Sequence, residues 1–230
     1  MKKTVIYTCF LLLTTLLFAQ EPIQRNLGDF NSVYIFNGLE VQLQKSHTSY
    51  IEISGSQASD VSVKNSNGKL KIRLKITKSI IPEDVQIILH YQHPIELLDA
   101  NEGAVFISAD TLQQDYIELK AQEGARISLI VQVKNLKVKS VTGAQIEVSG
   151  KATNQQVLAR TGAKYKALQL NAVDTFAKVS SGATIIINSS DLLDVKTSFG
   201  GTIYYKPSTN KTLRIKYNKI LGGQLKVYQE

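Results

Sequence analysis

The chain has 230 residues, with 27 Lys and Arg, 19 Asp and Glu, and a formal net charge of +8. Hydrophobic residues make up 43% of the chain and charged residues 20%, which excludes a disordered tail, a collagen-like fibre and a protein with several membrane spans. A single Cys also excludes a small disulfide-stabilised protein. A chain of this length can bury a sizeable core in one or two domains.

The first residues have the pattern of a secretory signal peptide. Lys2 and Lys3 precede a short apolar run over residues 5–18, and the small Ala at its end predicts a signal peptide over residues 1–19. The alternative is a retained N-terminal membrane anchor, for which the apolar run is short. Cys9 lies inside the run, whereas the Cys of a lipoprotein follows it.

Removal of this signal peptide also removes the only Cys, so the mature chain has neither disulfides nor thiolate metal ligands. We therefore expect its stability to come from core packing and backbone hydrogen bonds. The signal peptide predicts an exported protein, located in the periplasm, on the cell surface or outside the cell, with no transmembrane segment in the mature chain.

A repeat with a period near 20 residues fills the C-terminal half. A Gly followed by Ala or Gly recurs at positions 103, 124, 143, 162, 182, 200 and 222. A fixed period of this length indicates a solenoid. Positions three residues after the Gly are all apolar or aromatic, and we expect them to stack as one interior column: Phe106, Ile127, Ile146, Tyr165, Ile185, Ile203 and Leu225.

Apolar residues also dominate five positions before and five positions after each Gly. Offsets of one parity lie on one face of a strand, so each repeat is predicted to contain a strand, a Gly turn, a second strand and a polar turn. This is the pattern of an all-β, single-stranded parallel β-helix with about 20 residues per coil. An antiparallel β-sandwich is the alternative, but it gives no reason for identical columns in successive repeats.

Residues 20–100 also contain strand-like segments, but their spacing is less regular. Asn37-Gly38 and Asn67-Gly68 are tight-turn signals. Solenoids need atypical ends, because a terminal coil exposes unpaired backbone edges. We therefore predict one domain over residues 20–230, with irregular coils and a cap over 20–100 and regular Gly-Ala repeats over 101–230.

Several stretches of the mature chain resemble a family of unknown function that is common in Bacteroidetes. They are Leu27-Gly28-Asp29-Phe30, the alternation through Val33, Ile35, Val41 and Leu43, the stretches 50–55 and 68–72, and the Gly-Ala repeats. The family is known as putative auto-transporter adhesin, head GIN domain. The resemblance implies a right-handed β-helix, export and an adhesin-like role, with no catalytic motif to transfer. The chain lacks the lipoprotein Cys of many relatives.

Side chains that could carry chemistry are few. His47, His90 and His93 are the chain's histidines, and the last two lie three apart on an extended segment, so they should point to opposite faces. Exposed or packed histidines are therefore favoured over a metal site, and no metal or cofactor is predicted.

The carboxylates that should face outward are dispersed through the repeats: Asp99, Glu118, Glu147 and Asp194. We expect them at different offsets from the glycines, without the paired cluster that a polysaccharide lyase or hydrolase needs. Carboxylates distant in sequence can still meet in space, so a carbohydrate-active enzyme stays the alternative to a protein without enzyme activity.

One outward column is basic. Four positions before the glycines stand Asp99, Lys120, Lys139, Leu158, Lys178, Lys196 and Asn218. If the coils stack, Lys120, Lys139, Lys178 and Lys196 form a line of ammonium groups. They could bind an acidic glycan, a lipopolysaccharide or an envelope protein, or they could simply form a solvated face that keeps the sheet soluble. Nucleic acid is not an expected partner of an exported protein.

The sequence thus predicts an exported β-helix without enzyme activity that acts as an adhesin-like or envelope-binding module. Two rival functions remain on the same fold. One is a carbohydrate-active enzyme, and the other is a periplasmic spacer that binds no ligand. The pattern does not predict an oligomeric state.

Overall fold

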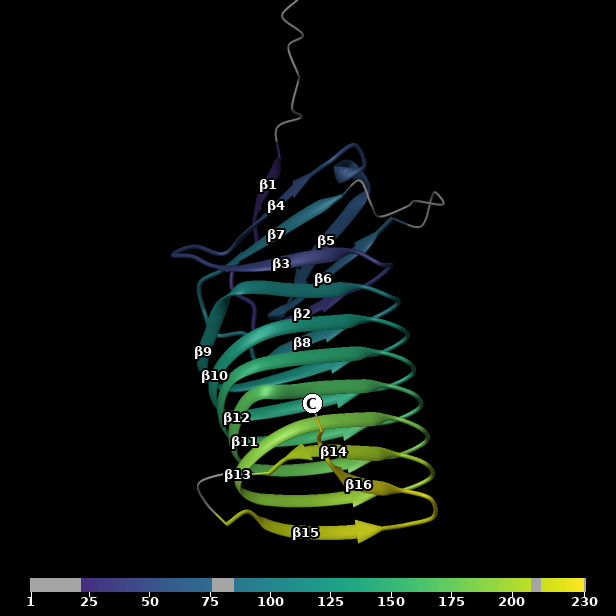
Figure 1. Cartoon of the computed structure of the whole chain (residues 1–230). Helices are drawn as coiled ribbons and strands as arrows, with labels where there is room; N and C mark the ends of the chain where they lie inside the picture. The colour runs from purple at the N-terminus through teal and green to yellow at the C-terminus, as the bar shows by residue number, and fades with distance from the viewer. Residues whose placement is uncertain (1–21, 76–84, 208–211, 230) are drawn as a thin grey trace, which may run out of the picture.

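The computed structural model describes residues 22–75, 85–207 and 212–229, which form a β-solenoid of about six turns (Figure 1). The predicted signal peptide, residues 1–19, lies outside the described residues. Within these three ranges, no helix is long and apolar enough to cross a membrane. The described helical segment is a single 3-10 turn, η1 (Ala58–Asp60).

The strands in chain order are β1 (Ile23–Asn26), β2 (Ser32–Ile35), β3 (Glu40–Lys45), β4 (Tyr50–Ser54), β5 (Val61–Ser66), β6 (Lys69–Leu74), β7 (Gln86–Tyr91), β8 (Leu97–Ala100), β9 (Val105–Ala121), β10 (Arg126–Ser140), β11 (Gln145–Ala159), β12 (Lys164–Val179), β13 (Thr184–Thr197), β14 (Thr202–Lys206), β15 (Arg214–Lys219) and β16 (Gln224–Val227).

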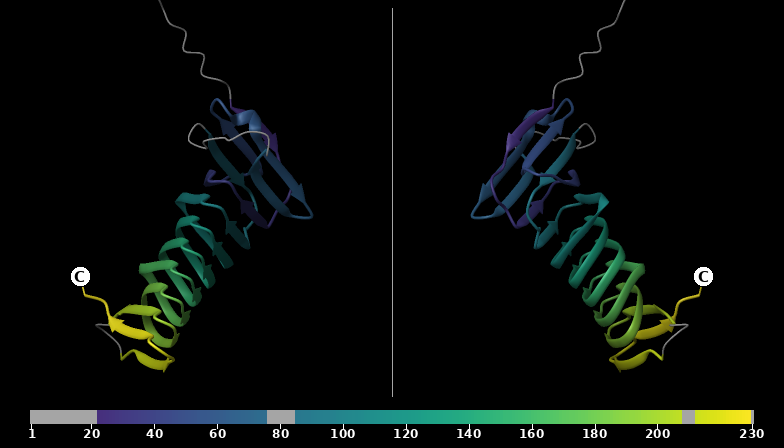
Figure 2. Two further views of the ribbon diagram at one scale, coloured as in Figure 1. Left: turned by 90° about the vertical axis from the view of Figure 1, so that its right-hand side faces the viewer. Right: turned by 90° about the vertical axis from the view of Figure 1, so that its left-hand side faces the viewer.

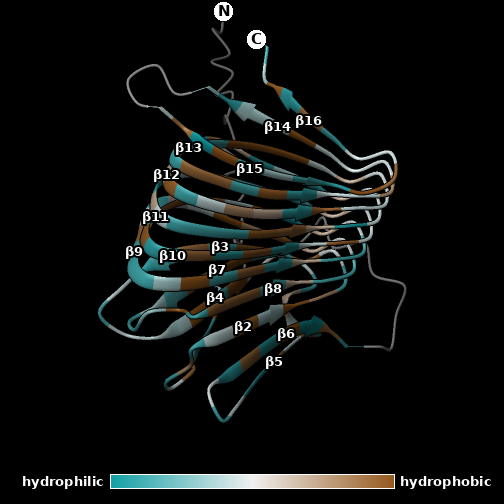
Figure 3. Ribbon diagram, turned by 90° about the horizontal axis from the view of Figure 1, so that it is seen from below, coloured by the Kyte–Doolittle hydropathy of each residue, from teal (hydrophilic) through white to brown (hydrophobic). Residues whose placement is uncertain are grey.

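The regular coils are five long strands, β9 to β13, each of which runs round the solenoid from one Gly turn to the next. Each strand pairs in parallel with the strand before and the strand after it. Buried and exposed residues alternate along them, as the brown and teal bands in Figure 3 show. The predicted parallel β-helix with about 20 residues per coil is therefore confirmed.

The predicted interior column is also confirmed. Phe106 lies opposite Ile127, and the register continues without interruption to Leu225 on β16. The column's members from Phe106 to Ile203 are at most 1% exposed. Parallel in-register stacking causes this burial, because each side chain is covered by its equivalents in the coils above and below.

A short polar chain crosses the interior between two neighbouring coils, β11 and β12. Tyr165 Oη donates to Gln155 Oε1 at 3.1 Å, and Gln155 Nε2 donates to Thr175 Oγ1 at 2.8 Å. All three residues are fully buried. Burial raises the pKa of the Tyr165 hydroxyl, so it stays protonated and remains a donor.

Each Gly turn is a type I′ turn. At the first one, Glu102 and Gly103 have φ values of 54° and 74°, and Ala104 N donates to Asn101 O at 3.0 Å. Such a turn needs positive φ at both central residues, which Gly adopts because it has no Cβ. Gly103 N also donates to Glu123 O at 3.0 Å, so the turns form a ladder of their own.

Two of these turns place Thr where φ is positive. Thr142 and Thr161 have φ values of 51° and 53°, a region that β-branched residues avoid. We expect Thr142→Asn and Thr161→Asn each to raise the free energy of unfolding by about 0.5–1 kcal/mol, because Asn tolerates this conformation. Thermal melting followed by circular dichroism measures the gain. Thr153→Asn, on strand β11 outside these turns, is the control and should give no increase in Tm.

The second bend of each coil differs from the prediction. A polar turn was expected there, but β9 to β13 continue as strands through the bend. In β10, two successive exposed residues, Lys134 and Asn135, mark the bend, and neighbouring coils pair on both sides of it in an unchanged register. A separate turn is therefore not needed. The register shifts a few residues earlier, for example between Ser128 and Ile130.

The N-terminal strands stack in an order that differs from their order in the chain. β2 and β3 join through Asn37-Gly38, which forms the same type of turn as the later glycines, and they pair with β8 and β9. β6 and β7 then lie on the far side of β2 and β3. A turn of the regular type therefore already occurs at Asn37-Gly38, within residues 20–100.

Antiparallel strands end this side of the solenoid. β4 pairs antiparallel with β7, β1 with β4, and β5 with β6. Figure 2 shows these strands at one end of the stacked coils and β15 and β16 at the other. Antiparallel strands thus lie at this end, and their pairing stops the parallel stacking.

Candidate functional site: a basic groove

The predicted lysine column exists as a set of stacked residues. Strand register places its members opposite one another on β8 to β13 and β15: Asp99, Lys120, Lys139, Leu158, Lys178, Lys196 and Asn218. Successive members are one rung apart, about 4.8 Å. The column forms because outward residues at one offset from the Gly turn repeat in every coil.

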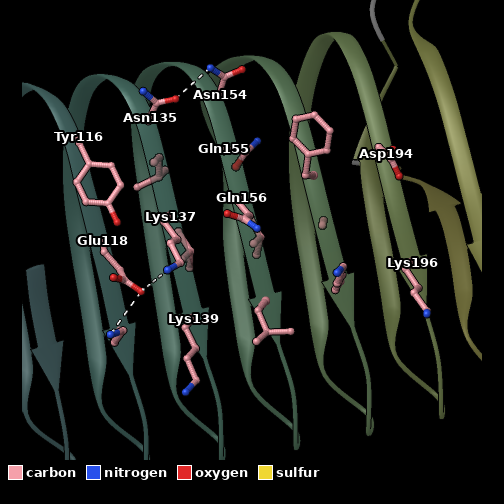
Figure 4. A pocket seen from close by; sticks show the side chains of 18 of the residues that line it. Tyr116, Glu118, Asn135, Lys137, Lys139, Asn154, Gln155, Gln156, Asp194 and Lys196 are labelled. Atoms are coloured by element: carbon pink, nitrogen blue, oxygen red, sulfur yellow. Dashed lines mark hydrogen bonds and ion pairs between the residues drawn. The ribbon is translucent and has the colours of Figure 1, made fainter.

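This column lines an open depression with a volume of about 1080 Å³ (Figure 4). We call it the basic groove. It is lined by outward side chains of β9 to β13 between residues 116 and 196. Besides the four lysines of the column, its walls include Lys137, Arg160, and the amides of Asn135, Asn154 and Gln156.

The four lysines of the column are not equivalent. Glu118 Oε1 lies 3.4 Å from Lys120 Nζ and 3.1 Å from Lys137 Nζ, and its hydrogen bond and charge raise the pKa of the Lys137 ammonium group. In the described parts of the chain, no carboxylate lies within 4 Å of Lys139, Lys178 or Lys196. The unneutralised positive charge therefore lies in the half of the groove nearer the C-terminus.

Exposed apolar side chains lie among these charges. Tyr116 and Phe176 are 39% and 43% exposed, and half-buried Leu158 interrupts the lysine column between Lys139 and Lys178. An exposed ring on a flat strand face can stack on the apolar face of a sugar. Sequence reasoning missed both aromatic residues, although their outward parity in the repeat was a signal that could have identified them.

The structure changes the interpretation of the outward carboxylates. Glu118 and Asp194 share a column, contrary to the expectation, but four rungs, or about 19 Å, separate them. Paired catalytic carboxyl groups of glycosidases lie about 5–9.5 Å apart. Glu147 lies on the other sheet face, in the first half of β11, and does not line the groove.

Asp99 and Glu118 are the outward carboxylates that come near each other, on the neighbouring strands β8 and β9. Burial raises the pKa of the Asp99 carboxyl, and the charge of Glu118 acts in the same direction. A hydrogen bond from Asn101 and the charges of Lys120 and Lys139 oppose the increase. Asp99 lies just outside the groove lining, at its N-terminal end.

The structure does not bring the histidines together. His90 is buried, its ring stacks on Tyr50 with a centroid distance of 4.0 Å, and its Nε2 lies 3.6 Å from Glu52 Oε2. His93 is exposed, and its Nε2 lies 3.5 Å from Asp29 Oδ1. His47 is exposed. Across the described residues, no group of three or more potential metal ligands occurs.

Comparison with known proteins agrees with this architecture. The family model described as "Putative auto-transporter adhesin, head GIN domain" matches residues 29–208. The chain belongs to this family. The resemblance seen in the sequence is thereby confirmed, and it extends over most of the solenoid and the cap. No curated protein matches the chain significantly.

Solved structures of similar fold come from Bacteroidetes. A putative adhesin from Bacteroides fragilis has a TM-score of 0.80 at 15% identity, covering 91% of this chain and 98% of its own. A putative adhesin from Parabacteroides merdae has a TM-score of 0.70 at 16% identity, covering 90% and 95%. A protein from Parabacteroides distasonis described as a putative lipid binding protein has a TM-score of 0.68 at 16% identity, covering 91% and 98%. At identities of 15% and 16%, these similarities show a shared fold and no shared function.

Proposed function

We propose that the chain is an exported, adhesin-like binding module without enzyme activity that holds an acidic glycan in the basic groove. The observation that carries the proposal is the line formed by Lys139, Lys178 and Lys196. No carboxylate of the described residues lies within 4 Å of these lysines, and they share one depression with exposed aromatic rings. Membership of an adhesin-named family and the adhesin-named structural neighbours support the same class of function.

Each kind of side chain in the groove matches a part of such a ligand. Ammonium groups of the lysines pair with carboxylate or sulfate groups, which they attract over a distance of about a Debye length. Tyr116 and Phe176 offer rings for sugar faces, and the amides of Asn135 and Asn154 can exchange hydrogen bonds with hydroxyl groups. Asn154 Nδ2 already donates to Asn135 Oδ1 at 3.1 Å, so these amides are held in position.

Heparin binding tests the proposal. We expect the mature protein to bind heparin at low salt and to release it as salt rises, because exposed ion pairs are screened. Replacing Lys139, Lys178 and Lys196 with Gln should weaken binding by roughly 10- to 100-fold, since three exposed ion pairs are lost. Lys120→Gln should have a smaller effect, because Glu118 already neutralises that ammonium group.

The control variant replaces Lys151, Lys164 and Lys166 with Gln. These residues are exposed, lie outside the groove lining and change the net charge by the same amount. All variants should keep the wild-type melting temperature. Equal weakening in both triple variants would show a general charge effect and contradict the groove. If the wild-type protein bound neither heparin nor lipopolysaccharide, a periplasmic spacer without a ligand would be the better-supported function.

The Asp99–Glu118 pair favours one second candidate, a carbohydrate-active enzyme. A half-buried carboxyl with a raised pKa beside a second carboxylate is a feature of general acid catalysis. Incubation with heparin or polygalacturonate followed by a reducing-end assay tests it. Release of new ends by wild type and its loss in Asp99→Asn would replace the binding function with a catalytic one.

A further inference from the structure

The C-terminal end of the solenoid leaves its interior columns uncovered. Ile215 and Tyr217 on β15 are 42% and 41% exposed, and Val227 on β16 is 47% exposed. Ile215 pairs with Leu193 and Tyr217 with Val195, which are at most 1% exposed. The columns of Ile215 and Tyr217 are thus buried one coil earlier, and these two side chains are exposed because no further coil among the described residues covers them.

The backbone at this end also has a free edge. Within residues 22–75, 85–207 and 212–229, β15 pairs with β13 alone and β16 with β14 alone. The opposite edge of each strand offers amide and carbonyl groups that an added strand can satisfy. Tyr217 covers part of the end, because its hydroxyl lies 3.1 Å from Thr197 Oγ1.

This region is basic, although on the neighbouring strand β13 Asp194 lies opposite Lys216 and Asp191 accepts a hydrogen bond from Arg214. Residues 195–229 contain no Asp or Glu, and their basic residues are Lys196, Lys206, Lys211, Arg214, Lys216, Lys219 and Lys226. Lys219 occupies an interior column in which Thr197, Val179 and Ala159 are buried in the preceding coils. A second copy of this end would bring like charges together on the same edge, which is unfavourable.

We propose that this end of the solenoid docks an acidic β-strand of another protein, which adds to the free edge of β15. The added strand would satisfy the backbone of β15, and its apolar side chains would cover Ile215 and Tyr217. Its outward carboxylates would pair with Lys216, and one carboxylate beyond the apolar pair, on the interior side, would pair with Lys219. This interaction surface adjoins the basic groove, because Lys216 lies opposite Asp194 of the groove lining, but neither Lys216 nor Lys219 lines the groove itself.

The probe is a labelled peptide of eight residues that alternates Glu and Val and ends in Glu-Glu, so that one Glu faces Lys219 on the interior side. Fluorescence anisotropy is the measurement. We expect wild type to bind it, and we expect a variant with Lys216→Glu and Lys219→Glu to bind at least about ten-fold more weakly. The control variant carries Lys64→Glu and Lys69→Glu, which make the same charge change on exposed residues of β5 and β6 at the other end. It should bind like wild type.

Three further measurements decide between strand addition and other contacts. The same peptide N-methylated at alternate residues should lose binding if backbone hydrogen bonds hold it. Equal binding of the N-methylated peptide would overturn strand addition, and so would the absence of any peptide binding by wild type. Sedimentation with phosphatidylglycerol vesicles that depends on Lys216 and Lys219, without peptide binding, would indicate a membrane surface instead. A dimer that the Lys216/Lys219 variant abolishes, seen by light scattering, would indicate a second copy.

Heparin binding separates this inference from the proposed function. The Lys216/Lys219 variant should bind heparin like wild type or with a modest loss, while the Lys139/Lys178/Lys196 variant should still bind the peptide. Failure of peptide binding with heparin binding intact would overturn the docking end alone. If heparin binding failed while peptide binding stayed intact, only the proposed glycan site in the basic groove would be contradicted.

Discussion

Replacing Ile146 with Asp should prevent the protein from folding. Ile146 is 1% exposed and lies between Ile127 and Tyr165 in the interior column. The new carboxyl would be buried without a partner, and the cost of about 4 kcal/mol or more is a large part of the stability of an ordinary domain. Loss of the cooperative thermal transition, or recovery only as aggregates, is the expected result.

Two control variants separate this effect from a general sensitivity of β11. Ile146→Val removes one methylene and should lower the free energy of unfolding by about 1 kcal/mol. Glu147→Gln changes the next residue, which faces outward, and should melt like wild type. An Ile146→Asp protein with the wild-type melting temperature would contradict the buried column.

Gly150→Ala should be the most damaging single-methyl change in the solenoid. Gly150 has a φ of 106°, and a Cβ added there would lie 2.1 Å from Val131 O on the neighbouring strand. Neither backbone can move without breaking the ladder, so we expect a loss of about 4 kcal/mol or more in the free energy of unfolding. Chemical denaturation followed by circular dichroism measures it.

Gly143→Ala is the matched control for this prediction. Gly143 also has a positive φ, 72°, but an added Cβ would find no atom within 4 Å. Its cost should be limited to backbone strain, about 1–2 kcal/mol. If both variants lost a similar amount of unfolding free energy, the backbone around Gly150 would relax more easily than the short distance to Val131 O indicates.

The regular coils could be predicted because their information is local and repeated. A constant offset from a Gly turn decides which residues face inward, and parallel stacking then places equal offsets opposite one another. The column from Phe106 to Leu225 and the lysine column follow from this rule. The second bend did not follow, because a polar residue pair such as Lys134 and Asn135 resembles a turn whether or not neighbouring strands hold it in the sheet.

The sequence predicts that the groove is basic, but it does not predict which of its lysines are neutralised by a carboxylate. Lys120, Lys139, Lys178 and Lys196 share an offset, so the sequence places them in one line. The neutralisation of Lys120 by Glu118 depends on side-chain conformations within β9 and on Lys137 in the next coil. The depression itself requires the side chains of five strands, which no single repeat contains.

By itself, the sequence determined the β-helix, its period, its buried column and the basic face, because these depend on periodicity within about 20 residues. The tertiary structure alone decided the order of the N-terminal strands, the approach of Asp99 to Glu118 and the open basic end at β15. These features arise from contacts between segments distant in the chain, such as β3 with β7 and β2 with β6. Pairing of this kind depends on which edges remain free after the regular coils have formed, and no local pattern records it.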